Sequence, residues 1–120
     1  MMSTQGSKGL ERLFKAFGFS MQGLSAAFRN EAAFRQEIYL SIVLVPLGIY
    51  FGGTGAERAL LVSVVFLVLI IELINSGLEA VIDRFGGEHH ELSGRAKDIA
   101  SVAVLISLIN VLIVWGCVLI

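Results

Sequence analysis

The 120-residue chain alternates long uncharged apolar runs with short segments that hold nearly all of its charges. The uncharged runs cover residues 38–56, 59–71 and 99–120, and apart from Glu72 the second continues to Leu78. A helix of about 20 apolar residues crosses the ~30 Å hydrocarbon core of a bilayer. The pattern therefore predicts three transmembrane helices, over residues 36–52, 57–83 and 97–119.

The first two predicted spans are joined by a very short link. Gly52-Gly53-Thr54-Gly55 is a turn signal, and a link of this length allows only an antiparallel helical hairpin. Pro46 lies inside the first span, where proline kinks a membrane helix but is tolerated.

The segment before the first span carries a helical stripe of large apolar side chains. They recur at helical spacing: Leu10, Leu13, Phe14, Phe17, Met21, Leu24 and Phe28. Arg12 and Lys15 lie off this stripe. We expect residues 10–34 to form an amphipathic helix that lies on the membrane surface or packs against protein, and residues 1–9 to lack fixed structure.

Composition narrows the class of protein. Hydrophobic residues make up 56% of the chain and charged residues 16%, against about 45–50% and ~25% in soluble domains. A soluble chain this small buries only about two-thirds of its unfolded surface, so the apolar excess argues against a soluble fold.

The net charge of −1 argues against nucleic-acid binding. The single cysteine, Cys117, allows no internal disulfide, and we expect it to be a small buried apolar residue.

The basic residues are sorted along the chain. Five of the nine Lys and Arg residues precede the first span, three lie between the second and third spans, and Arg58 alone lies between the first and second. The positive-inside rule then predicts that the N-terminus and the 84–97 loop face the cytoplasm and that the C-terminus faces outward.

The second span carries polar side chains on one face, within an arc of about 100°. They are Glu72, Asn75, Ser76, Glu79 and Asp83. A snorkelling helix end would explain Asp83 and Glu79, but Glu72 lies about three turns deeper, where a carboxylate indicates function. Two carboxylates at this spacing can bind a Mg²⁺ ion that is shared with substrate phosphates, and a third carboxylate can act as a general base. A proton or ion relay would use the same row of carboxylates.

The loop after the second span supplies further candidates. His89 and His90 are adjacent and would point about 100° apart on a helix, which disfavours a shared zinc ion. Arg95 and Lys97 either hold phosphates or anchor the chain at the cytoplasmic surface. The sequence has no Walker A motif and no GxGxxG, so a nucleotide would bind without a standard phosphate loop. From composition alone, Glu31 is a solvated carboxylate.

Three segments together resemble the prokaryotic diacylglycerol kinases, a family of small integral-membrane lipid kinases. They read NEAAFRQE at residues 30–37, ELINSGLEAVIDR at residues 72–84 and HELSGRAKD at residues 90–98. The resemblance covers residues 10–120, in the family's order and spacing. It implies an all-α integral membrane fold and a homotrimeric helical bundle whose subunits each have three transmembrane helices and an N-terminal amphipathic surface helix.

The resemblance also implies a reaction and a set of site residues. With ATP and Mg²⁺ as cofactors, the γ-phosphoryl group passes to the hydroxyl of diacylglycerol, which gives phosphatidic acid. Glu72 matches the catalytic base. Glu31 and Glu79 match the ligands of metal and nucleotide, and Asn75 belongs to the same polar cluster, which Asp83 extends. Further ATP-binding matches are Glu88, His90, Lys97 and Asp98, and the substrate-binding matches are Arg12, Ala33, Phe34, Arg35, Gln36, Glu37, Glu72 and Ser101. Phe19 stands where the family has a tyrosine.

The expected location is the bacterial cytoplasmic (inner) membrane, with the lipid substrate, and not nucleic acid, as partner. Two alternatives remain: an undecaprenol kinase of the same family, and a small proton- or ion-conducting membrane subunit. The sequences of the first and third segments resemble the diacylglycerol kinases more than the undecaprenol kinases. A relay would not need Glu31 together with the cluster of Arg95, Lys97 and Asp98.

Overall fold

Helices account for almost all of the chain that the structure describes. The computed structural model describes residues 8–84 and 91–120. Its helices are α1 (Gly9–Asn30), α2 (Ala32–Phe51), α3 (Gly55–Asp83) and α4 (Glu91–Leu119). Those two stretches contain no strand, and the predicted all-α class is confirmed.

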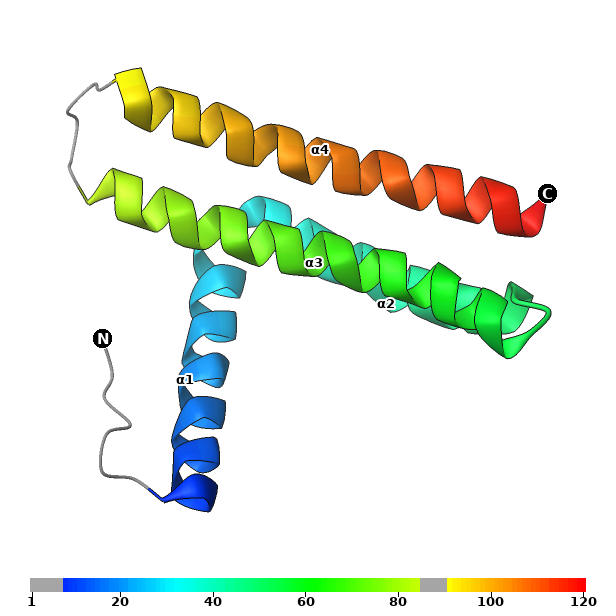
Figure 1. Cartoon of the computed structure of the whole chain (residues 1–120), viewed down its shortest axis with the longest axis horizontal. Coiled ribbons are helices and arrows are strands. Elements are labelled where there is room, and N and C mark those ends of the chain that lie inside the picture. Colours follow the sequence, from blue (N-terminus) through cyan, green and yellow to red (C-terminus); the bar gives the residue numbers. More distant parts are fainter. Residues whose placement is uncertain (1–7, 85–90) are drawn as a thin grey trace.

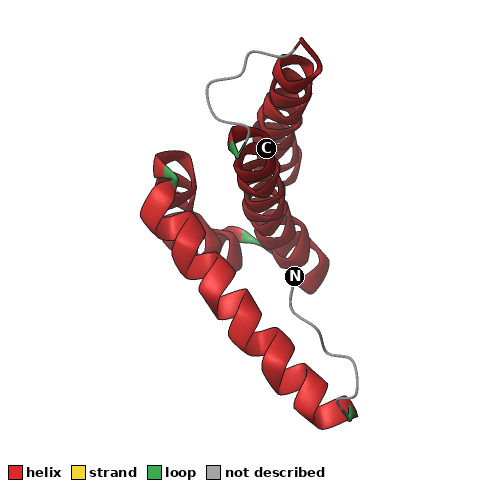
Figure 2. Cartoon of the chain, turned by 90° about the vertical axis from the view of Figure 1, so that its left-hand side faces the viewer, coloured by secondary structure: helices red, strands yellow, loops and turns green. Residues whose placement is uncertain are grey.

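The helices α2, α3 and α4 lie side by side, and α1 runs crosswise to them (Figure 1). Figure 2 shows this bundle nearly end-on, with α1 crossing in front. The helix α3 is central because it packs against both α2 and α4. It also provides most of the buried apolar side chains, namely Leu61, Val64, Val65 and Val68.

Three helices are long and apolar enough to cross a membrane, as the sequence predicted. They are α2, α3 and α4, with 20, 29 and 29 residues. In the most apolar stretch of α4 only 6% of the residues are buried by the chain itself. Uncovered apolar side chains of this density are stable in hydrocarbon rather than in water. The helix α2 continues through Pro46 as one element.

The predicted amphipathic helix does not continue to residue 34. The backbone at Glu31 is extended, and a new helix begins after it. Arg35 stabilises this break, because its Nη1 donates to the carbonyl oxygens of Phe28 (2.8 Å) and Arg29 (3.0 Å) at the end of α1. The sequence pattern did not reveal this break, because residues on both sides of Glu31 are compatible with a helix.

The third span also differs from its prediction, since α4 begins at Glu91 instead of residue 97. The added turns are polar, and Glu91 forms an exposed i,i+4 pair with Arg95 (3.9 Å). The prediction followed the uncharged run, whereas a helix extends past the hydrocarbon wherever its polar side chains reach water. The helices α2 and α3 also begin earlier than predicted, by four and two residues, and the start of α3 is fixed by the N-cap at Thr54.

The predicted hairpin between α2 and α3 is present and is closed by a capping box. Thr54 Oγ1 accepts from the backbone N–H of Glu57 (3.1 Å), and Glu57 Oε1 accepts from the backbone N–H of Gly53 (2.7 Å). A Cβ at Gly52 would lie only 2.5 Å from the Cγ of Arg58, so this turn requires glycine.

The apolar stripe of α1 faces away from the rest of the chain. Leu10, Leu13, Phe14 and Phe17 are all at least 64% exposed. The stripe therefore does not pack against the rest of the chain in this half of α1, and its exposure fits a helix that lies on a membrane. Cys117 is exposed on α4, so the expectation of a buried cysteine is wrong. A lipid-facing position suits the same apolar character.

Candidate active site

Glu72 is the only buried charged side chain in the described part of the chain, with 4% of its surface exposed. It belongs to the half of α3 that leads to Asp83, on the side that packs against its neighbours. The charges near enough to act on it are those of Glu37, Glu79 and Glu31, all of the same sign. Within the described stretches, none of these four carboxylates forms an ion pair. Like charges gathered around a buried carboxylate favour the binding of a cation.

Asn75 positions one of these carboxylates. Its Nδ2 donates to Glu79 Oε1 (3.0 Å), an i,i+4 contact on the polar face of α3. The Oδ1 of Asn75 is buried and has no partner among the described residues. A buried acceptor without a donor is costly, so a bound ligand or water that donates to Asn75 Oδ1 would stabilise the site.

Glu31 reaches the same site from the junction of α1 and α2. It borders a hollow of about 640 Å³ between α1 and α3, together with Asn30 of α1 and Ser76 and Ala80 of α3. The side chain of Glu31 caps neither helix. Its carboxylate is therefore available to a ligand, and the break after Asn30 is what brings it to α3.

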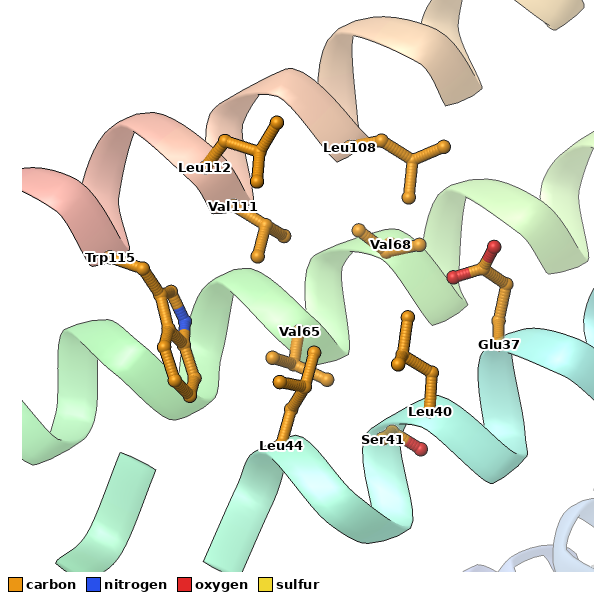
Figure 3. A pocket seen from close by; sticks show the side chains of 10 residues that line it. All are labelled: Glu37, Leu40, Ser41, Leu44, Val65, Val68, Leu108, Val111, Leu112 and Trp115. Carbon is orange, nitrogen blue, oxygen red and sulfur yellow. The ribbon is translucent and has the colours of Figure 1, made fainter. Parts of the chain in front are cut away.

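Glu37 lies at the end of an apolar cavity of about 340 Å³ between α2, α3 and α4. Figure 3 shows Glu37 at one end of this cavity and Trp115 at the other, with aliphatic side chains between them. Ser41, one turn from Glu37, is buried on the same wall. Glu37 therefore connects the acidic cluster to a space that suits hydrocarbon.

Lys97 and Asp83 join the ends of α4 and α3. The Lys97 Nζ donates to Asp83 Oδ1 (2.8 Å), and both side chains are largely exposed. Lys97 is also near enough to Glu79 for their charges to interact. The pair places the predicted phosphate-binding amine beside the polar face of α3. Asp98 is exposed next to it.

Other predicted substrate residues are not brought together in this chain. Arg12 is exposed and lies 18 residues before Asn30, about 27 Å away along α1. Phe34 is almost fully buried as a core residue, and Ser101 is exposed on α4. Ala33 and Gln36 are exposed at the start of α2, and Arg35 holds the end of α1. The predicted ATP ligands Glu88 and His90 lie outside the described residues.

The residues fit a divalent cation only if phosphates complete its coordination. In the described stretches, no group of three or more His, Cys, Asp or Glu side chains is arranged to hold a metal. Mg²⁺, however, is commonly held by one or two carboxylates together with water and substrate phosphates. Glu31 and Glu79 provide such oxygen donors, and neither forms an ion pair with a described residue.

Comparison with known proteins identifies the family. Residues 18–119 match the model of the prokaryotic diacylglycerol kinases. This chain belongs to the prokaryotic diacylglycerol kinase family. It is similar to the diacylglycerol kinases of Haemophilus influenzae (50% identity over 92% of this chain and 94% of that protein) and Escherichia coli K12 (50%, over 92% and 90%). It is also similar to that of Pseudomonas aeruginosa (44%, over 96% and 94%).

As a member of the prokaryotic diacylglycerol kinase family, the chain is an enzyme of the inner membrane, with a lipid as substrate and ATP as phosphate donor. The helical register of the sequence indicated Glu72 and Glu79, whereas Glu31 and Glu37 were expected only from the family resemblance. Sequence reasoning missed two contacts: the bond from Asn75 to Glu79 and the cap that Arg35 provides for α1. An amide four residues before a carboxylate and a basic residue just after a helix end were the signals for these.

Proposed function

We propose that this chain transfers the γ-phosphoryl group of ATP to the hydroxyl of diacylglycerol and so produces phosphatidic acid. The observation that carries the proposal is Glu72, a buried carboxylate within a span that interacts with Glu31, Glu37 and Glu79. The names of its relatives support the lipid substrate. A proton or ion relay is less favoured. A relay needs a row of carboxylates, but it does not need the Glu31 carboxylate and the Lys97 ammonium group near that row.

Glu72 acts as the general base. The lipid hydroxyl oxygen attacks the γ-phosphorus in line with the departing oxygen of ADP, so one P–O bond forms and another breaks. The hydroxyl proton passes to the Glu72 carboxylate during the attack and later leaves to water. Phosphoryl transfer depends mainly on position and charge. A base placed deep in a span suits a hydroxyl that rises from the bilayer toward ATP arriving from water.

Glu31 and Glu79 would hold Mg²⁺ together with the phosphates of ATP. When bound, the ion would supply charge neutralisation for the transferred group. Asn75 fixes the position of the Glu79 carboxylate through the 3.0 Å hydrogen bond to its Oε1. Lys97 and Asp98 bind the nucleotide, with Glu88 and His90 as further ligands. The ion pair of Lys97 with Asp83 is exposed and therefore contributes little free energy. The Lys97 ammonium group can exchange Asp83 for a phosphate of ATP at little cost.

The active enzyme is a homotrimer in which neighbouring subunits complete each site. Two features support this: Arg12 lies about 27 Å along α1 from Asn30, and α4 is hardly covered by its own chain. The remaining lipid contacts come from Ala33, Phe34, Arg35, Gln36, Glu37 and Ser101. The N-terminus lies in the cytoplasm and the C-terminus on the outer side. The structure supports this orientation by placing α1 and the start of α4 at one end of the bundle, opposite the α2–α3 turn (Figure 1).

Replacing the base tests the proposal. Glu72→Gln keeps the size of the side chain but cannot accept the proton, and we expect turnover to fall at least about 100-fold, within the range of general-base catalysis. ATP binding should persist. The assay is transfer of radiolabelled phosphate from ATP to diacylglycerol or undecaprenol in mixed micelles, at equal lipid mole fraction.

Glu11→Gln is the matched control, because Glu11 is an exposed carboxylate on α1 paired only with Lys15 (3.4 Å). It should retain wild-type turnover. Near-normal turnover in Glu72→Gln would remove Glu72 from the role of base. A strong preference of the wild type for undecaprenol would overturn the choice of lipid while leaving the kinase chemistry intact.

A further inference from the structure

Asn110 is an unusual residue for its position in the membrane. It is the only Asn, Gln or charged residue in the run 99–120 of α4. It lies 12 residues after Asp98, the last charge before that run, which is about 18 Å along the helix. In a hydrocarbon core of ~30 Å this position is close to the middle of the bilayer.

Asn110 lies at the edge of a shallow apolar hollow between α3 and α4. The hollow has a volume of about 370 Å³ and is lined by Leu67 and Ile71 of α3 and by Ala103, Ile106, Ser107 and Asn110 of α4. Neither Asn110 nor this hollow has a role in the reaction proposed above. The hollow lies apart from the Glu37 cavity, which α2 helps to form.

The two polar side chains of the hollow differ in how they are satisfied. Ser107 is buried and donates its hydroxyl to the Val104 carbonyl of its own helix (2.6 Å). The amide of Asn110, by contrast, has no hydrogen-bond partner within residues 8–84 and 91–120, and it is only partly covered. It therefore remains open at the surface of the α3–α4 pair.

The surroundings of the bilayer centre limit what can satisfy this amide. Lipid tails have no hydrogen-bonding groups, and little water reaches this depth, so the partner must be protein. An asparagine amide carries both donors and an acceptor, so it is complementary to another copy of itself. Polar side chains of this kind hydrogen-bond between membrane helices, and small residues beside them allow the backbones to approach. Ala103 and Ser107, one turn apart in the same hollow, are such residues.

We propose that this hollow receives a second copy of the chain, and that the Asn110 amide hydrogen-bonds across the interface between subunits. The inference rests on the self-association proposed above and names the surface that carries it. In a threefold assembly, three such amides can each donate to the next and satisfy all three copies. The sparse coverage of α4 by its own chain leaves this face free for the contact.

Subunit association measured at increasing lipid dilution tests this surface. Full-length chains labelled with donor or acceptor fluorophores at the N-terminus are diluted in phosphatidylcholine vesicles, and energy transfer reports association. We expect Asn110→Leu and Asn110→Ala to weaken association about threefold for each lost hydrogen bond, or close to thirtyfold for three. Asn110→Gln keeps the amide and should lie close to the wild type.

Ser107→Ala is the matched control, because its hydroxyl lies in the same hollow but is already bonded within α4. It should change association by less than twofold. If Asn110→Leu and Asn110→Ala associate as tightly as the wild type, the inference about this surface is wrong while self-association stands. If the wild type remains monomeric at every dilution, both the trimer and this interface are wrong.

Discussion

The two ends of the bundle are built in opposite ways. At the end with the α2–α3 turn, which we call the turn end, Leu61 is fully buried and a Cβ on Gly48 would lie 3.1 Å from its Cβ. Trp115 Nε1 donates to the Leu61 carbonyl there (3.0 Å). At the opposite end, which we call the acidic end, Glu72 and Glu79 lie among like charges, and neither has an ion-pair partner among the described residues.

This difference separates stability from activity. Close packing and a satisfied hydrogen bond stabilise the turn end, and no titratable side chain takes part in that contact. The buried Glu72 carboxylate among like charges and the unpartnered Asn75 Oδ1 make the acidic end costly, which is typical of sites kept for function. Changes at the acidic end should therefore alter turnover or ligand affinity, and changes at the turn end should alter unfolding.

The largest effect is expected from Asn75→Ala at the acidic end. The change removes the hydrogen bond that holds Glu79 Oε1, and loss of such a supporting contact typically costs 10–100-fold in metal affinity. The Mg²⁺ concentration for half-maximal activity should rise by about that factor, and excess Mg²⁺ should restore part of the rate. Titration of kinase activity with Mg²⁺ measures it.

Thermal unfolding in detergent gives the second arm of this comparison. Asn75→Ala also removes a buried acceptor without a partner, so the melting temperature should not fall. Ser63→Ala on the same helix is the control, because Ser63 Oγ donates only to the Leu60 carbonyl (3.2 Å). An unchanged Mg²⁺ requirement in Asn75→Ala would exclude the positioning role. A large drop in stability would show that the acidic end also holds the fold together.

The sequence could predict the acidic end better than the turn end, for a physical reason. The register of Glu72 and Glu79 follows from the helical period alone, and the spans follow from the uncharged runs. The contact of Trp115 with Leu61 joins residues 54 positions apart, which no local pattern encodes. The break at Glu31 was missed because Arg35 makes it from the next helix. The place of Arg12 likewise depends on the crosswise direction of α1, which its own sequence does not encode.

A smaller effect is expected from Gly48→Leu at the turn end. A Cβ at this position would contact Leu61, Trp115 and Val62 at 3.1–3.5 Å, so a leucine side chain must push α2 away from α3. Overpacking of this kind costs about 1–3 kcal/mol, and the melting temperature should fall accordingly. The Mg²⁺ requirement of the folded enzyme should not change.

Gly116→Leu is the control for helix propensity, because no neighbouring atom lies within 4 Å of a Cβ built at Gly116. It should melt at or above the wild-type temperature. If Gly48→Leu is as stable as Gly116→Leu, then α2 and α3 are not held by close packing at this end. If its Mg²⁺ requirement rises, the two ends are coupled.

The smallest effect is expected from Trp115→Phe, which isolates one hydrogen bond at the turn end. Phenylalanine retains much of the indole's packing but cannot donate to the Leu61 carbonyl, so the loss should be about 0.5–1.5 kcal/mol. Tyr50→Phe removes a hydroxyl from a highly exposed ring near the same end and should leave the melting temperature unchanged. Turnover per folded enzyme should be equal in both variants, because neither residue reaches the acidic end. A fall in turnover for Trp115→Phe, at unchanged stability, would mean that the cavity joining Trp115 to Glu37 transmits packing changes to the site.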